Sequence, residues 1–388
     1  MVMESNILDI QELGSDVITN GQIGSIAVIG VGGGGCNTIN YLISHGIQQE
    51  VTLIAANTDA QHLKHNKARI KLQLGKKTTN GLGAGTNPEQ GKKAAVESEE
   101  EIRELLKNYD IIFIATGLGG GTGTGAAPVI AKIMRETGAL VISIATTPFR
   151  YEGKRRAKVA EAGKKELKAE SDCIIIIPND RISSKGGIGN RDAMAKVDSV
   201  LANAVKGLAN IILGGDGESN INIDFSDVSA VMKSRGLAVM GMGEAQGANA
   251  ANQALSNALS SEMMGNVNVT NAQGILVCLE IHPDYPREEM EEVLDRIGEY
   301  ETDETIYKCG IYTNESFSDD FVRITFIATG FADEVVEASV AQESVENLKM
   351  TSASASPTHQ SREIRRVSGD GITEVHYDIP TFMRQGQD

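Results

Sequence analysis

The chain has 388 residues, of which 41% are hydrophobic, and this is enough to bury one large core or two smaller ones. It contains 42 glycines and no tryptophan, and only 4% of its residues are aromatic, which argues against a ligand surface built from aromatic rings. The formal net charge of −16 disfavours nonspecific binding to nucleic acid or to an anionic membrane, because both are negatively charged themselves.

The cysteines and the N-terminus indicate the cellular compartment. The four cysteines are far apart, form no C-x-x-C pair and mostly sit among apolar residues, as expected for small buried side chains in a reducing compartment. The first residues lack the basic and apolar regions of a secretory signal, and no apolar run approaches the about 18 residues of a membrane span. We therefore expect a cytoplasmic protein.

The first half of the chain alternates strands with helices. Residues 1–24 are polar and aperiodic and are predicted to form a flexible arm. Short apolar, β-branched runs predict strands at 26–29, 51–56, 111–115, 140–145 and 173–178, and helical patterns cover 88–106, 125–137, 153–169 and 191–213. Because the strands are apolar on both faces, we predict an α/β domain over residues 25–190 whose parallel sheet carries helices on each side.

A different pattern begins after a long helix. Residues 191–214 are predicted to form a central helix that joins two domains. Beyond it, helices are expected at 227–240, 248–264 and 287–298, and strands at 274–281, 305–312 and 322–328. This order predicts an α+β domain with a mixed sheet over residues 215–331. Residues 332–376 are too polar to offset the entropy of ordering and are predicted to be a disordered linker, followed by a short peptide at 377–388.

The first glycine loop, residues 30–37, ends a strand and opens a helix. Gly30, Gly32 and Gly35 satisfy G-x-G-x-x-G, and Asp59 follows the second strand. This is a dinucleotide-binding fingerprint, because glycines let the backbone approach a phosphate at the N-terminus of a helix. A tight turn without a ligand and a nicotinamide-dependent oxidoreductase both remain open at this point.

The second glycine loop, residues 116–128, favours a triphosphate over a dinucleotide. It follows the predicted strand at 111–115 and contributes a second set of backbone amides, together with the hydroxyls of Thr122 and Thr124. No G-x-x-x-x-G-K-[ST] motif is present, so the phosphates must be held by backbone amides, hydroxyls and a metal ion rather than by a P-loop lysine. A third glycine loop at 81–88 could close over the terminal phosphate.

Residues 119–125, Gly-Gly-Gly-Thr-Gly-Thr-Gly, match the phosphate signature of tubulin-type proteins. Together with the first glycine loop, Asn57-Thr-Asp and Gly81-Leu-Gly-Ala-Gly, they make the chain resemble the FtsZ family, the bacterial tubulin-like GTPases of cell division, over residues 25–330 and again at 378–384. The resemblance implies a tubulin-like fold and GTP-dependent assembly into head-to-tail filaments. It also implies the division ring (Z-ring) at mid-cell, with hydrolysis at the subunit interface driving filament turnover during septum formation.

The resemblance assigns a set of residues to GTP. It implies phosphate contacts through the two glycine loops, ribose and phosphate contacts from Glu152 and Arg156, and guanine recognition by Asn179 and Asp198. Cys36 stands where many relatives have glycine or asparagine, and Met194 stands where an aromatic residue often packs on the base. The full set is Gly33, Gly34, Gly35, Cys36, Asn37, Asn57, Gly120, Gly121, Thr122, Gly123, Glu152, Arg156, Asn179 and Asp198.

Three polar residues before the predicted helix at 227–240 are the catalytic candidates. From the residues alone, Asp224 and Asp227 read as a helix N-cap and a first-turn acid, with Asn222 just before them. The resemblance implies that this loop enters the nucleotide pocket of the next subunit, where the acids polarise the attacking water. Mg²⁺, held mainly by phosphates and water, would neutralise the terminal phosphate.

The resemblance also extends to partners. Asp378, Ile379, Pro380, Phe382 and Met383 match the family's terminal recognition motif, which implies binding to membrane-anchoring division proteins of the FtsA, SepF or ZipA kind. The resemblance also implies that copies of the chain itself and inhibitors of the Min system are partners, and that assembly takes place on the inner face of the membrane. It implies no binding to nucleic acid and no direct insertion into the membrane.

Two other classes of function compete with the GTPase. The second glycine loop and the lack of an obvious histidine for hydride transfer argue against an oxidoreductase. An adaptor that binds nucleotide without hydrolysis or assembly is disfavoured by the three polar residues at 222, 224 and 227.

Overall fold

The computed structural model describes residues 25–47, 49–183, 190–214, 219–233, 236–261, 263–265 and 267–332. All of them belong to one unit, which ends at Glu343. The predicted N-terminal arm, nearly all of the predicted linker and the whole terminal peptide lie outside the described residues.

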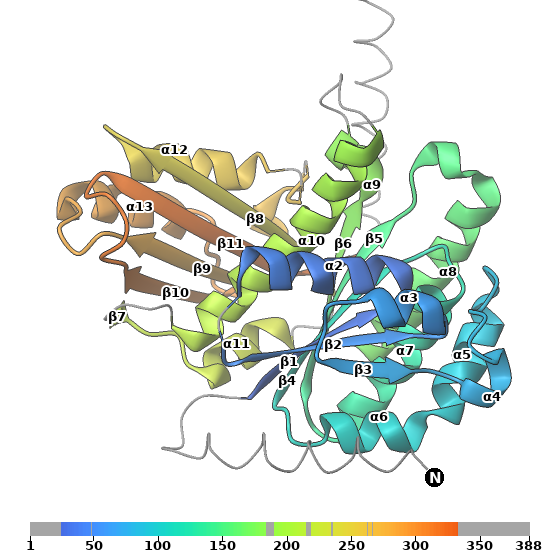
Figure 1. Cartoon of the computed structure of the whole chain (residues 1–388). Coiled ribbons are helices and arrows are strands. Elements are labelled where there is room, and N and C mark those ends of the chain that lie inside the picture. Colours follow the sequence, from blue (N-terminus) through green and yellow to red (C-terminus); the bar gives the residue numbers. More distant parts are fainter. Residues whose placement is uncertain are drawn as a thin grey trace, which may run out of the picture. The chain divides into compact units, whose positions relative to one another are not determined.

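A parallel sheet forms the first part of the fold, as the apolar, β-branched runs predict (Figure 1). Neighbouring strands follow the order β3-β2-β1-β4-β5-β6, and each pair is parallel. Their carboxyl ends therefore meet at one edge of the sheet, which is where ligands bind in open α/β folds. The strands are β1 (Ile26–Val31), β2 (Val51–Asn57), β3 (Ile70–Gln73), β4 (Ile111–Gly117), β5 (Leu140–Thr147) and β6 (Cys173–Pro178).

Helices bury both faces of this sheet. On β1, Ile29 and Val31 belong to one hydrophobic cluster and Ile26 and Val28 to another, because successive side chains of a strand point to opposite faces. The first cluster takes in side chains of α5 (Pro88–Glu97), α6 (Glu99–Leu106), α7 (Thr122–Glu136) and α8 (Lys154–Glu170). The second takes in α2 (Gly32–His45), α3 (Ala60–His65) and α10 (Asn190–Leu213). Short helices complete this part: α4 (Lys76–Thr79), a 3₁₀ turn (Arg150–Glu152) and α9 (Asn179–Ser183).

The sheet continues into the second part of the chain and becomes mixed. β8 is parallel to β6 through the pairs Ile174–Leu237 and Ile175–Ala238. β11 runs antiparallel to β8 and β9, while β9 and β10 are parallel, so the order ends β8-β11-β9-β10-β7 in a sheet of 11 strands. These strands are β7 (Ser219–Ile221), β8 (Leu237–Gln246), β9 (Gly274–Ile281), β10 (Ile306–Thr313) and β11 (Phe321–Phe331).

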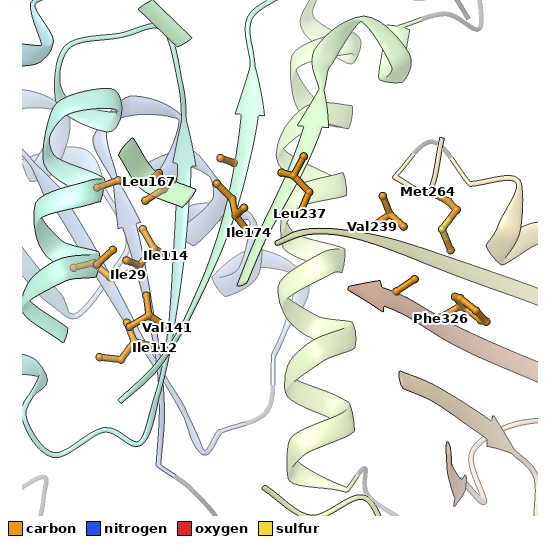
Figure 2. Close-up of a cluster of buried hydrophobic side chains, with 14 of the residues drawn as sticks. Ile29, Ile112, Ile114, Val141, Leu167, Ile174, Leu237, Val239, Met264 and Phe326 are labelled. Carbon is orange, nitrogen blue, oxygen red and sulfur yellow. The ribbon is translucent and has the colours of Figure 1, made fainter. Parts of the chain in front are cut away.

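Three further helices and a 3₁₀ turn accompany the mixed part: α11 (Phe225–Met232), α12 (Ala250–Leu259), the turn Val269–Asn271 and α13 (Arg287–Gly298). Figure 2 shows one hydrophobic cluster that extends from Ile29 and Ile114 in the parallel part to Val239 and Phe326 in the mixed part. The predicted fold class, a parallel-sheet domain and a mixed-sheet domain joined by a long central helix, is confirmed.

Several predicted elements are wrong in detail. The helix predicted at 88–106 is two helices separated at Ser98, whose hydroxyl accepts a hydrogen bond from the Gly75 amide at 2.9 Å. The helix predicted at 227–240 ends at Met232, and residues from Leu237 onward form β8, because their apolar side chains are buried by pairing with β11. The helix predicted at 248–264 ends at Leu259, and β3, β7 and β8 were not predicted. In the part of the chain described, no helix is both long and apolar enough to cross a membrane.

Candidate functional site

The first two glycine loops meet at the carboxyl ends of β1 and β4, which are paired at Val31 and Thr116. Gly32 has a φ of +73°, and a Cβ atom there would lie 2.8 Å from the backbone nitrogen of Gly123. A Cβ atom on Gly123 would itself lie 2.5 Å from the Gly117 carbonyl oxygen and 2.6 Å from the Thr116 hydroxyl. The loops therefore pack backbone against backbone, an approach that only glycine allows.

Two glycines of these loops face open space. No atom lies within 4 Å of the position that a Cβ atom would take on Gly33 or on Gly120. Gly33 lies in the first turn of α2 and Gly120 two residues before α7, and neither helix has a side-chain cap or an acidic residue in its first turn. The first amides of a helix have no partner within the helix and carry partial positive charge, so two helix N-termini are directed at one place that suits an anion.

Threonine hydroxyls tie the loops together. The Thr122 hydroxyl lies 2.6 Å from that of Thr58, which follows β2. The Thr124 hydroxyl accepts a hydrogen bond of 2.8 Å from the Gly119 amide, so it holds the shape of the second glycine loop from inside. Both threonines are at least nine-tenths buried. Their hydroxyls thus brace the loops, and the amides of the loops remain the main groups for a ligand.

Cys36 and Asn57 lie beneath the first glycine loop. The Cys36 thiol donates toward the Gly30 and Ala56 carbonyls at 3.7 Å, and burial raises its pKa to about 12. The Asn57 amide lies 3.0 Å from Nδ1 of His62 and is also buried. Both side chains are directed into the protein, and Cys36 is fully buried, so its side chain packs under the loop rather than facing a ligand. Asn37, by contrast, is exposed.

Asp59, the acidic residue of the dinucleotide-binding fingerprint, caps a helix. Its carboxylate caps α3 by accepting hydrogen bonds of 2.9 Å from the amides of Gln61 and His62. Both bonds go to Oδ1 of Asp59, so this contact fixes the orientation of the carboxylate at the start of α3.

Glu152 and Arg156 lie beside the second glycine loop. The two side chains form an ion pair of 2.7 Å, and Glu152 also accepts a hydrogen bond of 2.9 Å from the Phe149 amide. A Cβ atom on Gly119 would lie 2.9 Å from Cγ of Arg156, so the arginine packs directly on the loop. The structure thus brings together a carboxylate that can accept from hydroxyls and a cation that can face phosphate.

Asn179 and Asp198, the two residues predicted to read the base, are both shielded from water. The Oδ1 atom of Asn179, at the end of β6, is buried and has no hydrogen-bond partner. Burial raises the pKa of Asp198, on α10, to about 6. An orphaned acceptor and a desolvated carboxyl group are what a site for N–H donors requires, and the guanine edge has such donors. Met194 is 39% exposed on the same helix.

The predicted catalytic acids lie at the start of α11. Asp224 is its N-cap, and its carboxylate accepts hydrogen bonds from the Asp227 amide at 2.8 Å and from the Ser226 hydroxyl at 2.7 Å. These bonds, with a smaller contribution from Lys308, lower its pKa. Asp227 forms an ion pair of 2.5 Å with Lys308 of β10. Asp224 and Asn222 are exposed, so two of the three candidates are open to solvent.

Sequence reasoning missed Lys308. The signal that could have indicated it is a single lysine within the otherwise apolar run Ile306-Tyr-Lys-Cys-Gly-Ile of a strand. A charge at a position that should pack against a helix needs a partner.

The acids and the glycine loops lie at opposite ends of α10 (Figure 1). This helix follows β6 and α9 and has 24 residues, so it is about 36 Å long. Its far end is joined to residues 222–227, the acidic loop, by Tyr312. The Tyr312 hydroxyl donates to the Ile211 carbonyl at 3.0 Å and accepts from the Ile223 amide at 3.4 Å. Within one chain, the acids cannot reach a ligand bound at the glycine loops.

Two family models match the chain. The model described as the GTPase domain of the Tubulin/FtsZ family matches residues 25–186, and that of the FtsZ family C-terminal domain matches residues 236–332. The matches lie on either side of α10.

Relatives and solved structures agree with these matches. The chain is 43% identical over 370 residues to the cell division protein FtsZ of Helicobacter pylori strain J99, covering 94% of this chain and 92% of the relative. It is 42% identical over 312 residues to that of Neisseria gonorrhoeae, covering 80% and 79%. The empty FtsZ dimer of M. jannaschii superposes with a TM-score of 0.73 at 38% identity, covering 84% of this chain and 93% of that one.

Proposed function

The chain belongs to the tubulin/FtsZ family and is a GTPase of cell division, and from this premise we propose that it assembles head to tail into the filaments of the bacterial division ring. GTP is hydrolysed at each contact between subunits, and this hydrolysis drives the turnover of the filament during septum formation. The supporting observation is that α10, about 36 Å long, separates the glycine loops from the acids at 224 and 227.

The triphosphate binds at the uncapped N-termini of α2 and α7. We assign Gly33, Gly34, Gly35, Cys36 and Asn37 to one side of the triphosphate and residues 120–123 to the other, with the free amides supplied by the first residues of each helix. The open space at Gly33 and Gly120 supports this assignment. Mg²⁺, bound by phosphate oxygens and water, would reduce the negative charge of the terminal phosphate.

The nucleoside lies over the neighbouring strand ends. Glu152 accepts hydrogen bonds from the ribose, and Arg156 adds positive charge close to the phosphates where a P-loop lysine is missing. The unpartnered oxygen of Asn179 and the carboxyl group of Asp198 accept from the guanine N–H groups. Adenine has no N–H donor at the corresponding ring nitrogen, so this pair favours GTP over ATP.

Hydrolysis requires two subunits. Asp224 and Asp227 of one subunit orient the water that attacks the terminal phosphate in the pocket of the next, with Asn222 beside them. A carboxylate that holds water in line with the phosphorus atom contributes through position rather than through covalent chemistry. A contact of this kind is heterologous, so it generates an open filament.

Mixing two inactive variants tests this arrangement. Gly33→Asp places a carboxylate in the open space at the phosphate site and blocks nucleotide binding, while Asp224→Asn keeps an N-cap but removes the acid. Each variant alone should be inactive. An equimolar mixture should recover up to about a quarter of the wild-type rate, because one in four random contacts joins an intact pocket to an intact acid. An inactive mixture, or full specific activity in dilute wild-type protein, would contradict the proposal.

We further propose three regions: a nucleotide-binding domain at 25–190, a central helix at 191–214 and a C-terminal domain at 215–331.

The terminal peptide, with Asp378, Ile379, Pro380, Phe382 and Met383, binds membrane-anchoring division proteins of the FtsA, SepF or ZipA kind and so brings filaments to the inner face of the membrane. Min-type inhibitors would act on the same filaments. Deleting residues 378–388 should preserve the GTPase rate and abolish binding to the anchor; unchanged binding would rule out this role.

A further inference from the structure

Lys308 lies directly against the acidic loop. It occupies β10, which α11 covers, and its ammonium nitrogen is 2.5 Å from Oδ1 of Asp227. Gly310, two residues further along the strand, shares its face, and a Cβ atom there would lie 2.7 Å from the Ile223 side chain. The acidic loop therefore packs against the face of β10 that carries Lys308.

The Lys308–Asp227 pair is not a buried structural ion pair. The side chain of Asp227 is 26% exposed and that of Lys308 is 39% exposed. Pairs with this much contact with water contribute little to folding stability. The same ammonium also contributes to the lowered pKa of Asp224, after the Ser226 hydroxyl and the Asp227 amide. Lys308 thus acts on both acids at the surface of the molecule.

The two acids face an electrostatic problem in the proposed filament. They must approach a triphosphate in the neighbouring pocket, and like charges at short range repel each other. The sequence contains no G-x-x-x-x-G-K-[ST] motif, so that pocket has no P-loop lysine. A cation delivered together with the acids would lower this repulsion and would also hold the Asp227 carboxylate in one orientation.

We propose that Lys308 is a positioning residue for GTP hydrolysis, which fixes the carboxylate of Asp227 and adds a positive charge to the surface that meets the neighbour's triphosphate. This inference rests on the proposed function, since it assumes that the acids serve the next subunit. It adds a third charged residue to that surface, contributed by a strand rather than by the acidic loop.

Lys308→Met and Lys308→Arg test the inference. Methionine keeps the length of the side chain and removes the charge, whereas arginine restores the charge. Lys107→Met is the matched control, because Lys107 forms an exposed ion pair of 2.6 Å with Glu104 on α6, away from the acidic loop. Thermal unfolding of each variant establishes that the fold is intact, and Lys308→Gln replaces Lys308→Met if the latter is destabilised.

The readouts are the GTPase rate per assembled subunit, the critical concentration for assembly and the affinity for GTP. Lys308→Met should lower the rate about three- to tenfold and leave the other two values within about twofold, and Lys308→Arg should recover most of the rate. A rate equal to that of Lys107→Met would overturn the inference, as would an arginine variant as slow as the methionine one. A changed critical concentration at an unchanged rate would also overturn it. Asp224→Asn is assayed in parallel: if that variant keeps full activity, the proposed function fails rather than the role of Lys308.

Discussion

Replacing Gly33 with alanine should strengthen the fold and weaken nucleotide binding at the same time. Gly33 lies inside α2, its φ is not in the left-handed region, and no atom lies within 4 Å of the new methyl group. Alanine is favoured over glycine in a helix interior by about 0.5–1 kcal/mol, and Gly33 is the second residue of α2, so the free energy of unfolding of the nucleotide-free protein should rise by at most that amount. The methyl group would occupy the space that we assign to phosphate. Loss of one or two charge-assisted hydrogen bonds then lowers GTP affinity by about 10- to 100-fold.

Gly123→Ala is the matched control within the second glycine loop. Its methyl group would collide with the Gly117 carbonyl and the Thr116 hydroxyl, at 2.5 Å and 2.6 Å. Overpacking of this kind costs about 1–3 kcal/mol, so this variant should lose stability as well as affinity. Urea unfolding of nucleotide-free protein and GTP titration by calorimetry separate the two effects. An unchanged GTP affinity in Gly33→Ala would refute the placement of phosphate against this loop.

Three further changes probe other parts of the site. Burial raises the pKa of Asp198 from 3.8 to about 6, so its ionisation opposes folding increasingly between these pH values and fully above them. Asp198→Asn should therefore stabilise the nucleotide-free protein by about 2 kcal/mol at pH 7.5 and hardly at pH 3.5, measured by urea unfolding, while weakening GTP binding. Ser226→Ala removes the main hydrogen bond that lowers the pKa of Asp224, so the acid limb of the GTPase rate against pH should move to higher pH. Tyr312→Phe removes the link between α10 and Ile223 and should cost about 1 kcal/mol in urea unfolding, with a slower GTPase in assembled filaments.

Local patterns predicted the close packing of the two glycine loops and the position of the central helix well. A run of glycines after a strand predicts a close approach of backbones, and the structure has that approach at Gly32 and Gly123. The helix predicted at 191–213 is α10, which begins one residue earlier at Asn190, because a long amphipathic pattern needs no distant partner to be recognised.

Features that depend on distant parts of the chain were not predictable in this way. Residues from Leu237 onward are apolar in a pattern that fits helix or strand, and pairing with β11 far along the chain makes them a strand. The ion pair of Asp227 joins it to Lys308, 81 positions away in the sequence, so no local motif contains both. The orphaned oxygen of Asn179 is a property of burial and is invisible in the sequence.

The length of α10 has a consequence for the two tips of a filament. In the proposed filament, one terminal subunit would present a loaded pocket that no acid enters, and the other would present acids that meet no pocket. A polymer of n subunits would therefore contain n − 1 complete reaction centres, so the shortest oligomers would convert the smallest share of their bound nucleotide. The tip with the uncovered pocket would keep an intact triphosphate until another molecule docks there, which would make the polymer directional and give each tip its own chemical state.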